Sequence, residues 1–249
     1  MTFTWDPALV SAFALALVRA SAWLFISPPF NTRIVPIPVK AGVAAALALA
    51  AAPHVAEAEL SLETGPFVGA LLTQALIGIT LGMLTLLLFS VLTTAGSMID
   101  LFAGYSLAAI YDPSTENQTP IFGRFYQLLA VTLLFTTNAH LVLVGGFLKS
   151  FEAVPVDGLA SADIAALLTD SLGMFFVAAL EVAGPVLACL FLAEITMGLL
   201  ARAAPNLNVF ALAFPVRVGV ALIVVAIAVP LVSPAVENLV RAAVEPFGG

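Results

Sequence analysis

The stretch GLLARAAPNLNVFALAF, residues 198–214, is a polar turn inside the most apolar part of the chain. Nearly continuous apolar sequence precedes it over 172–200 and follows it over 209–232. Pro205 cannot continue a helix, and Asn206 and Asn208 tolerate the left-handed backbone that a tight reversal needs. The sequence therefore predicts two long helices that meet here as a hairpin.

Two charged residues lie at matching positions in this predicted hairpin. Glu194 precedes Pro205 by eleven residues and Arg217 follows it by twelve, so an antiparallel pair of helices places them at about the same depth. Each ion left unpaired near a bilayer centre would cost about 2.5–3.5 kcal/mol. The spacing favours an ion pair across the hairpin or contact with a protein partner. The alternative is that both side chains extend to water at the membrane surface.

The composition identifies an integral membrane protein. Of 249 residues, 62% are hydrophobic and 9% are charged, whereas about 25% of residues are charged in a typical soluble domain. The 15 acidic residues outnumber the 8 basic ones, for a net charge of −7. This balance disfavours nucleic-acid binding, which needs a basic surface.

Six apolar runs predict an all-α membrane protein with kinked or broken helices. A helix needs about 20 residues to cross the hydrocarbon of a bilayer. The third run holds several glycines, which let helix backbones approach closely, so it favours contact with protein rather than lipid. The runs cover residues 8–30, 39–56, 66–96, 121–148, 172–200 and 209–232.

The basic residues of the connections predict an orientation. Connections after odd-numbered runs hold four basic residues, and those after even-numbered runs, with the tail, hold two. The positive-inside rule therefore places the odd connections in the cytoplasm and both termini on the periplasmic side. The two sets are Arg33, Lys40, Arg124 and Arg202, against Lys149 and Arg241.

The third connection, GYSLAAIYDPSTENQTPIFGRF over 104–125, begins apolar and becomes a polar loop bounded by prolines. It is either a solvated linker or a loop folded into a pore or protein cavity, where irregular backbone is permitted. Asp100 and Arg124 each lie twelve residues from Asp112, so they are a second candidate charge pair. Arg19 lies in the middle of the first run, where extension to a surface is one interpretation.

Motifs of enzyme chemistry do not occur in the sequence. It holds no GxSxG, Walker A, HExxH or CxxC pattern. His54 and His140 lie 86 residues apart, and the single cysteine, Cys189, lies in an apolar run. We therefore predict no catalytic residue, no metal site and no cofactor.

Four stretches carry a resemblance to a known family. They are ALVRASAWLFISPPF (16–30), SMIDLFAGYSLAAIYDP (97–113), HLVLVGGFLKSFEAVP (140–155) and ARAAPNLNVFALAFPVRVGVAL (201–222). In this order they resemble the R-type export-gate component of bacterial flagellar type III secretion, the FliR family, whose injectisome counterpart is the T component, SctT. The last stretch is the most specific. It departs from the family pattern at Asn206, where Gln is common, and at Ala213, where Gly is frequent.

The resemblance implies a structural, pore-forming subunit of a protein export gate in the bacterial inner membrane, within the basal body. It implies assembly with P-type and Q-type gate subunits, the B-type switch protein, the A-type export protein and the basal-body ring, and passage of unfolded export substrates. It also implies a P-like part over 1–165 and a Q-like hairpin over 166–249. The alternatives are a secondary transporter for a small solute, which should show inverted repeats, and an intramembrane enzyme.

Two candidate sites follow from matching the family's motifs. A loop over 104–122 would close the pore, since hydrophobic constrictions exclude water, and a tip over 201–210 would contact the switch protein in the cytoplasm. The loop residues are Gly104, Tyr105, Leu107, Ile110, Tyr111, Asp112, Pro113, Ile121 and Phe122. The tip residues are Arg202, Pro205, Asn206, Asn208 and Phe210.

Overall fold

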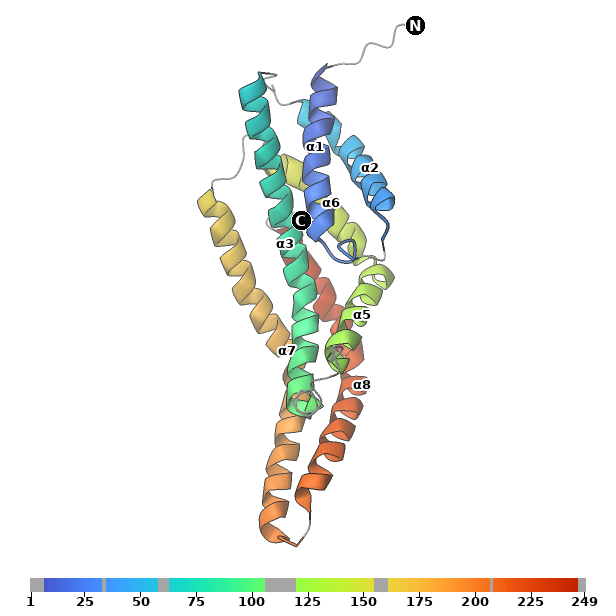
Figure 1. Cartoon of the computed structure of the whole chain (residues 1–249), viewed down its shortest axis with the longest axis vertical. Coiled ribbons are helices and arrows are strands. Elements are labelled where there is room, and N and C mark those ends of the chain that lie inside the picture. The colour runs from blue at the N-terminus through green and yellow to red at the C-terminus, as the bar shows by residue number, and fades with distance from the viewer. Residues whose placement is uncertain are drawn as a thin grey trace, which may run out of the picture. The chain divides into compact units, whose positions relative to one another are not determined.

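The computed structural model of the chain describes residues 7–32, 35–57, 63–105, 120–154, 161–206 and 208–245. Within these ranges every regular element is a helix and there is no strand, which confirms the all-α prediction (Figure 1). The helices are α1 (Pro7–Ile26), α2 (Ile37–Ala56), α3 (Thr64–Ala103), α5 (Ile121–Thr136), α6 (Ala139–Ala153), α7 (Ser161–Ala203) and α8 (Val209–Val244).

Five of these helices are long and apolar enough to cross a membrane, and the number is six if the bent pair α5 and α6 forms one span. The five are α1, α2, α3, α7 and α8. They coincide with five of the six apolar runs in the sequence. The membrane character inferred from composition therefore holds for the helices as well.

The fourth apolar run, 121–148, is not one continuous helix. It breaks between Thr136 and Ala139, where Asn138 has a φ of 58°. This left-handed conformation ends α5, and asparagine is one of the few residues with a side chain that adopts it readily. The sequence marks this break only by a short polar stretch, residues 136–138, between two apolar helices.

The chain divides into two compact units, each built from separated stretches of sequence. The first unit comprises Met1–Leu88, Asn138–Gly173 and Leu239–Gly249, and the second comprises Phe89–Thr137 and Met174–Asn238. The predicted division into a P-like part and a Q-like hairpin concerns likeness to other subunits and stays a prediction.

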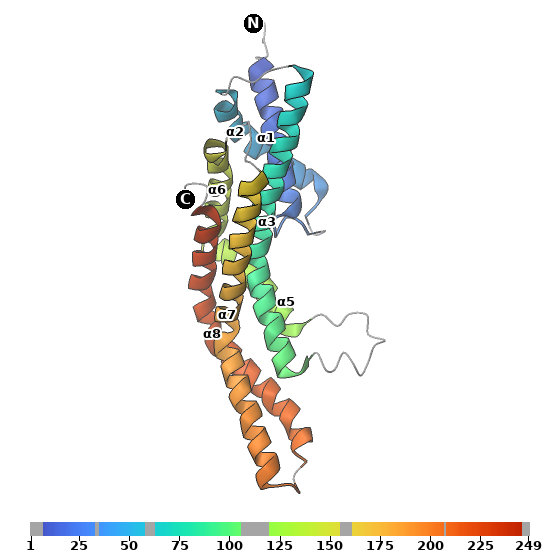
Figure 2. The ribbon, with the colours of Figure 1, turned by 90° about the vertical axis from the view of Figure 1, so that its left-hand side faces the viewer.

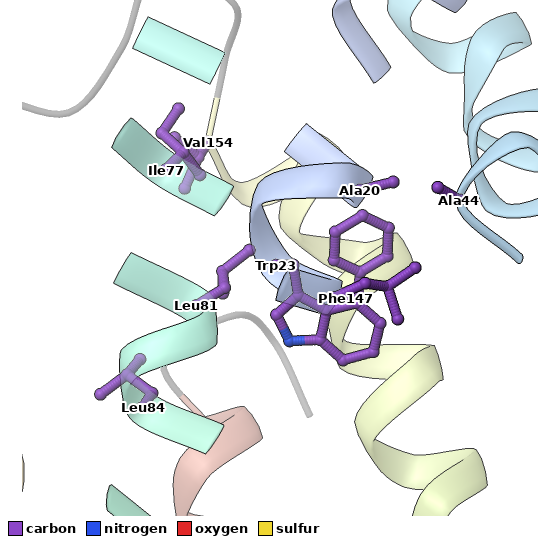
Figure 3. Close-up of a cluster of buried hydrophobic side chains, with 9 residues drawn as sticks. Ala20, Trp23, Ala44, Ile77, Leu81, Leu84, Phe147 and Val154 are labelled. Carbon is purple, nitrogen blue, oxygen red and sulfur yellow. The ribbon is translucent and has the colours of Figure 1, made fainter. Parts of the chain in front are cut away.

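The core of the first unit is formed by α1, α2, α6 and the first part of α3 (Figure 3). The rings of Trp23 and Phe147 stack with their centroids 4.6 Å apart. A Cβ atom added at Gly78 would collide with the carbonyl oxygen of Arg19, and one at Gly82 would lie 2.8 Å from Ile26 Cβ. The glycines of α3 therefore allow the backbones of α1 and α3 to touch, as small residues do in membrane helix pairs.

In the second unit, α7 and α8 form the predicted hairpin (Figures 1 and 2). The two helices run side by side over their parts near the turn in both views. α7 ends at Ala203, a turn holds Pro205 and Asn206, and α8 begins at Val209. Proline and asparagine end the helix here, because proline cannot continue a helix and asparagine tolerates the backbone conformations of a turn.

Candidate functional site

The two ends of the segment between α3 and α5 lie against each other in the second unit. α3 ends at Ala103, and Gly104 follows with a φ of +90°, which only glycine adopts without strain. α5 begins at Ile121, directly after Pro120, whose ring is compatible with the start of a helix. Residues 106–119 lie outside the described residues.

The carboxylate of Asp100 joins these two ends. Asp100 is 2% exposed, and its two oxygens accept hydrogen bonds from Phe122 N at 3.0 Å and from Gly123 N at 2.9 Å. The first N–H groups of a helix have no partner within the helix, and a negative charge at this end is stabilised by the helix dipole. Asp100 of α3 therefore caps the N-terminus of α5.

The predicted charge pair between Asp100 and Arg124 is wrong. Arg124 instead donates from Nη1 to Oε1 of Gln127 at 2.9 Å on the exposed face of α5. The physical reason is that backbone N–H groups at the start of α5 satisfy both carboxylate oxygens of Asp100. Spacing along the sequence cannot reveal this competition between a side chain and a helix end.

Two glycines bring α3 and α5 into backbone contact beside Asp100. A Cβ atom at Gly96 would lie 2.5 Å from Phe122 O and 2.7 Å from Gly123 N. A Cβ atom at Gly123 would lie 3.0 Å from both Ser97 Oγ and Pro120 Cβ. The helices can therefore approach this closely only without side chains at these positions.

Aromatic rings extend the contact between α3 and α5 toward α8. Tyr105 packs edge to face against Phe122 and against Phe214, each with ring centroids 6.0 Å apart. Such edge-to-face pairs contribute about 0.5–1.5 kcal/mol beyond the area that they bury. Phe122 is buried in this contact, while its neighbour Ile121 is exposed.

Four of the predicted loop residues are thus placed, namely Gly104, Tyr105, Ile121 and Phe122. The other five, Leu107, Ile110, Tyr111, Asp112 and Pro113, lie outside the described residues. Their role in closing a pore stays a prediction.

The structure brings Glu194 and Arg217 together across the α7–α8 hairpin. Arg217 Nη2 lies 2.5 Å from Glu194 Oε2, with the arginine side chain 21% and the glutamate side chain 56% exposed. A cavity of about 280 Å³ lies beside the pair and has apolar walls from α3 and α7, which include Leu101, Phe102 and Phe191. The spacing favoured this ion pair or contact with a protein partner, and the structure shows the ion pair within the hairpin.

The described residues of the predicted tip are exposed. Asn208 also accepts a hydrogen bond from Ala211 N at 3.3 Å through Oδ1, and so caps α8. The exposed residues are Arg202, Pro205, Asn206 and Asn208. The side chain of Phe210 lies outside the described residues, and contact of the tip with a switch protein stays a prediction.

Arg19 is a buried polar centre that the sequence did not reveal. It is 1% exposed and does not extend to a surface. Its Nε donates to Gln74 Oε1 at 2.6 Å, and its Nη1 and Nη2 donate to the backbone oxygens of Ser150 at 2.8 Å and Val154 at 3.3 Å. These carbonyls lie at the C-terminal end of α6, where a cation is favoured. The sequence shows only that Arg19 lies in the middle of an apolar run, and this position does not indicate which groups bond to it.

The described residues hold no group of three or more His, Cys, Asp or Glu side chains that could bind a metal ion. His54 and His140 belong to α2 and α6. The described side chains supply helix caps, the Glu194–Arg217 ion pair and close helix contacts, all of which join helices to one another.

Comparison with known proteins identifies the family. The family model described as "Bacterial export proteins, family 1" matches residues 10–243. The flagellar biosynthetic protein FliR of Bacillus subtilis is 31% identical over 242 residues, which cover 95% of this chain and 93% of that protein. FliR of Escherichia coli is 32% identical over 224 residues, with 90% and 86% covered.

A second group of relatives carries a different name. The Yop proteins translocation protein T of Yersinia pestis is 27% identical over 215 residues, which cover 84% of this chain and 82% of that protein. These names describe flagellar biosynthesis and protein translocation, and none describes an enzyme or a small-solute permease. The chain therefore belongs to the bacterial export proteins of family 1 and is a membrane component of a type III export apparatus.

Proposed function

We propose that this chain is a pore-forming subunit of the flagellar protein export gate in the bacterial inner membrane, where it passes unfolded substrates. The family match over residues 10–243 carries this proposal. The flagellar relatives from Bacillus and Escherichia are 31% and 32% identical and cover at least 90% of the chain, which favours the flagellar over the injectisome system.

Within the gate, the chain assembles with P-type and Q-type subunits, the B-type switch protein, the A-type export protein and the basal-body ring. The exposed apolar side chains of the candidate spans support this, since α7 and α8 expose large residues such as Phe176, Phe191 and Ile227. The tip of the α7–α8 hairpin faces the cytoplasm and both termini face the periplasm. The pore handles polypeptide and not nucleic acid, in keeping with the net charge of −7.

The segment 104–122 closes the pore when no substrate passes. Its apolar residues would form a constriction from which water is excluded. The contacts at the two ends of the segment support this role, because Asp100 fastens the start of α5 to α3 and Tyr105 packs against Phe122 and Phe214.

Deletion of the gene in a flagellated host tests the export function. Export of flagellar filament protein into the medium should be lost and should return when the full-length chain is supplied. Purification from the same cells should recover the chain as one copy in a large hetero-oligomer. A chain that purifies as a stable monomer and moves a small solute in liposomes would contradict the proposal.

Two further measurements test its parts. Deletion of 112–119 should make cells that assemble the apparatus leak small ions, and unchanged conductance would rule out the closing role. Alkaline phosphatase fused to either terminus should be active, whereas fusion after Arg202 should give an inactive enzyme. The reverse pattern would overturn the orientation.

A further inference from the structure

We propose that one face of α7 is a docking site for a membrane helix of another chain, and that Glu181 pairs there with a lysine or arginine of that helix. The inference rests on the proposed assembly with other gate subunits. Its new content is the residue, the face of α7 that surrounds it and the charge that the partner must supply.

The first support is the depth of Glu181 in the candidate span of α7. The nearest charged residues along the helix are Asp170, eleven residues before it, and Glu194, thirteen residues after it. A helix rises about 1.5 Å per residue, so Glu181 lies about 16 Å from Asp170, roughly half of the hydrocarbon thickness of a bilayer. A carboxylate at this depth is costly in lipid and is normally paired with another group.

The second support is that this chain offers the carboxylate no partner among the residues that the structure describes. α7 packs on its own chain through the opposite face, where Ala179, Ala183 and Val186 are buried, whereas Glu181 is exposed. Residues two apart on a helix do not share a face. The group that pairs with Glu181 must therefore come from outside the chain.

The third support is a backbone oxygen at the same place. Pro185 follows Glu181 by four residues inside α7. Proline has no N–H, so the carbonyl oxygen of Glu181 lacks the donor that a helix normally supplies. In a membrane, neighbouring helices are one source of donors for backbone groups that a proline frees. A guanidinium or ammonium group carries several donors and can serve both this oxygen and the carboxylate.

The face around Glu181 is open and apolar. Residues three or four apart on a helix are neighbours, and those on either side of Glu181 are small or aliphatic. A Cβ atom added at Gly184 would meet nothing within 4 Å, and small residues let the backbone of a second helix approach closely. The docking face consists of Met174, Val177, Glu181, Gly184, Ala188 and Leu192.

A second copy of this chain does not supply the cation from its described residues. Arg19 is buried and donates to Gln74, and Arg217 is paired with Glu194. The other basic residues that the structure describes lie near the ends of their helices. The partner is therefore a different chain, with an apolar helix that carries a lysine or arginine at the depth of Glu181.

The experiment purifies the tagged, full-length chain from cells that carry the whole apparatus, and measures the ratio of assembled to free chain on a native gel. Glu181→Gln keeps the shape of the side chain and removes its charge. It should lower the ratio at least about tenfold, as loss of one member of a buried charge pair does. Glu152→Gln makes the same change at an exposed residue in the last turn of α6 and should leave the ratio unchanged.

A double variant tests the face rather than the charge alone. Glu181→Leu with Leu180→Glu keeps the composition and the depth of the carboxylate, but moves it about 100° around the helix. Its ratio should be as low as that of Glu181→Gln. A wild-type ratio in this variant would overturn the assignment of the face.

Charge reversal identifies the partner and does not depend on the stability of the free chain. Glu181→Lys should abolish motility of a flagellated host. Selection for restored motility should yield replacements of a lysine or arginine in a membrane helix of another subunit. Revertants confined to this chain would overturn the proposal.

The same gel separates failure of this inference from failure of the proposed function. If the wild-type chain is assembled and Glu181→Gln has the wild-type ratio, Glu181 has no docking role and the proposed function stands. If the wild-type chain itself is recovered only as a free monomer, the proposed assembly fails, and the docking site fails with it.

Discussion

Replacement of Arg19 by methionine should destabilise the first unit strongly, although no carboxylate pairs with this arginine among the described residues. The guanidinium holds three elements together, since it lies on α1 and bonds to Gln74 of α3 and to the C-terminal end of α6. The Cζ atom of Arg19 also lies 4.1 Å from the centroid of the Phe151 ring, which adds a cation–π contact.

The expected magnitude follows from the acceptors that lose their donor. Ser150 O keeps a hydrogen bond from Val154 N at 3.1 Å. Among the described residues, Gln74 Oε1 and Val154 O are then the acceptors left without a donor. Each buried, unsatisfied acceptor costs about 1–3 kcal/mol. Relief of the buried charge offsets part of this loss, and we expect a net decrease of about 2–4 kcal/mol in the free energy of unfolding.

A second substitution tests the mechanism. Replacing both partners of a buried hydrogen bond by apolar groups can be nearly neutral, and Gln74 Nε2 has no partner among the described residues. Arg19→Met with Gln74→Leu should therefore be more stable than Arg19→Met alone. The gain in the free energy of unfolding should correspond to the removal of one unsatisfied acceptor, Gln74 Oε1.

Thermal unfolding of the detergent-solubilised chain is the assay. For a chain of this size 1 kcal/mol shifts Tm by about 2–4 °C, so Arg19→Met should lower Tm by about 4–16 °C. Arg202→Met, the same change at an exposed site, is the control and should leave Tm nearly unchanged. Equal Tm values for Arg19→Met and Arg202→Met would contradict this role of Arg19. A double variant less stable than Arg19→Met would contradict it as well.

Three further predictions concern the second unit and the break between α5 and α6. Gly96→Ala should lower Tm, because the added methyl group would collide with the backbone of α5. Gly198 has open space around it, so Gly198→Ala should raise the free energy of unfolding by up to about 1 kcal/mol. Equal Tm values for the two variants would contradict this. Glu194→Gln and Arg217→Gln should show a coupling of about 0.2–1 kcal/mol in a double-mutant cycle read by Tm, because the ion pair is partly exposed; strict additivity would rule out the pair. Asn138→Gly should keep the Tm of the native chain, and Asn138→Ala should lower it, since alanine disfavours a φ of 58°; the opposite order would show that α5 does not end for this reason.

The α7–α8 hairpin and its ion pair could be predicted because their cause is local. Pro205 and the two asparagines end a helix by their own backbone preferences. Once the turn is located, the regular rise of a helix places Glu194 and Arg217 at the same depth. Counting residues from the turn therefore made the ion pair a candidate, and the structure shows it.

The contact between α3 and α5 at Asp100 shows where such counting fails. Equal spacing suggested that Asp100 would pair with Arg124, but the carboxylate binds the backbone of α5 instead. A helix end is an anion site of its own, and its position depends on where the helix begins. The close approach that Gly96 permits is likewise a property of two helices in contact, not of either one alone.

Hydropathy, turn chemistry and the order of motifs are properties of the linear chain, so they were sufficient to predict the membrane character, the helical runs, the hairpin and the family. The folded chain is needed to show which acceptors bond to the guanidinium of Arg19 and which N–H groups donate to the carboxylate of Asp100. The physical reason is that a charge buried among helices is stabilised by whichever polar groups packing brings within about 3 Å. Those groups lie 22 to 135 residues away in the chain.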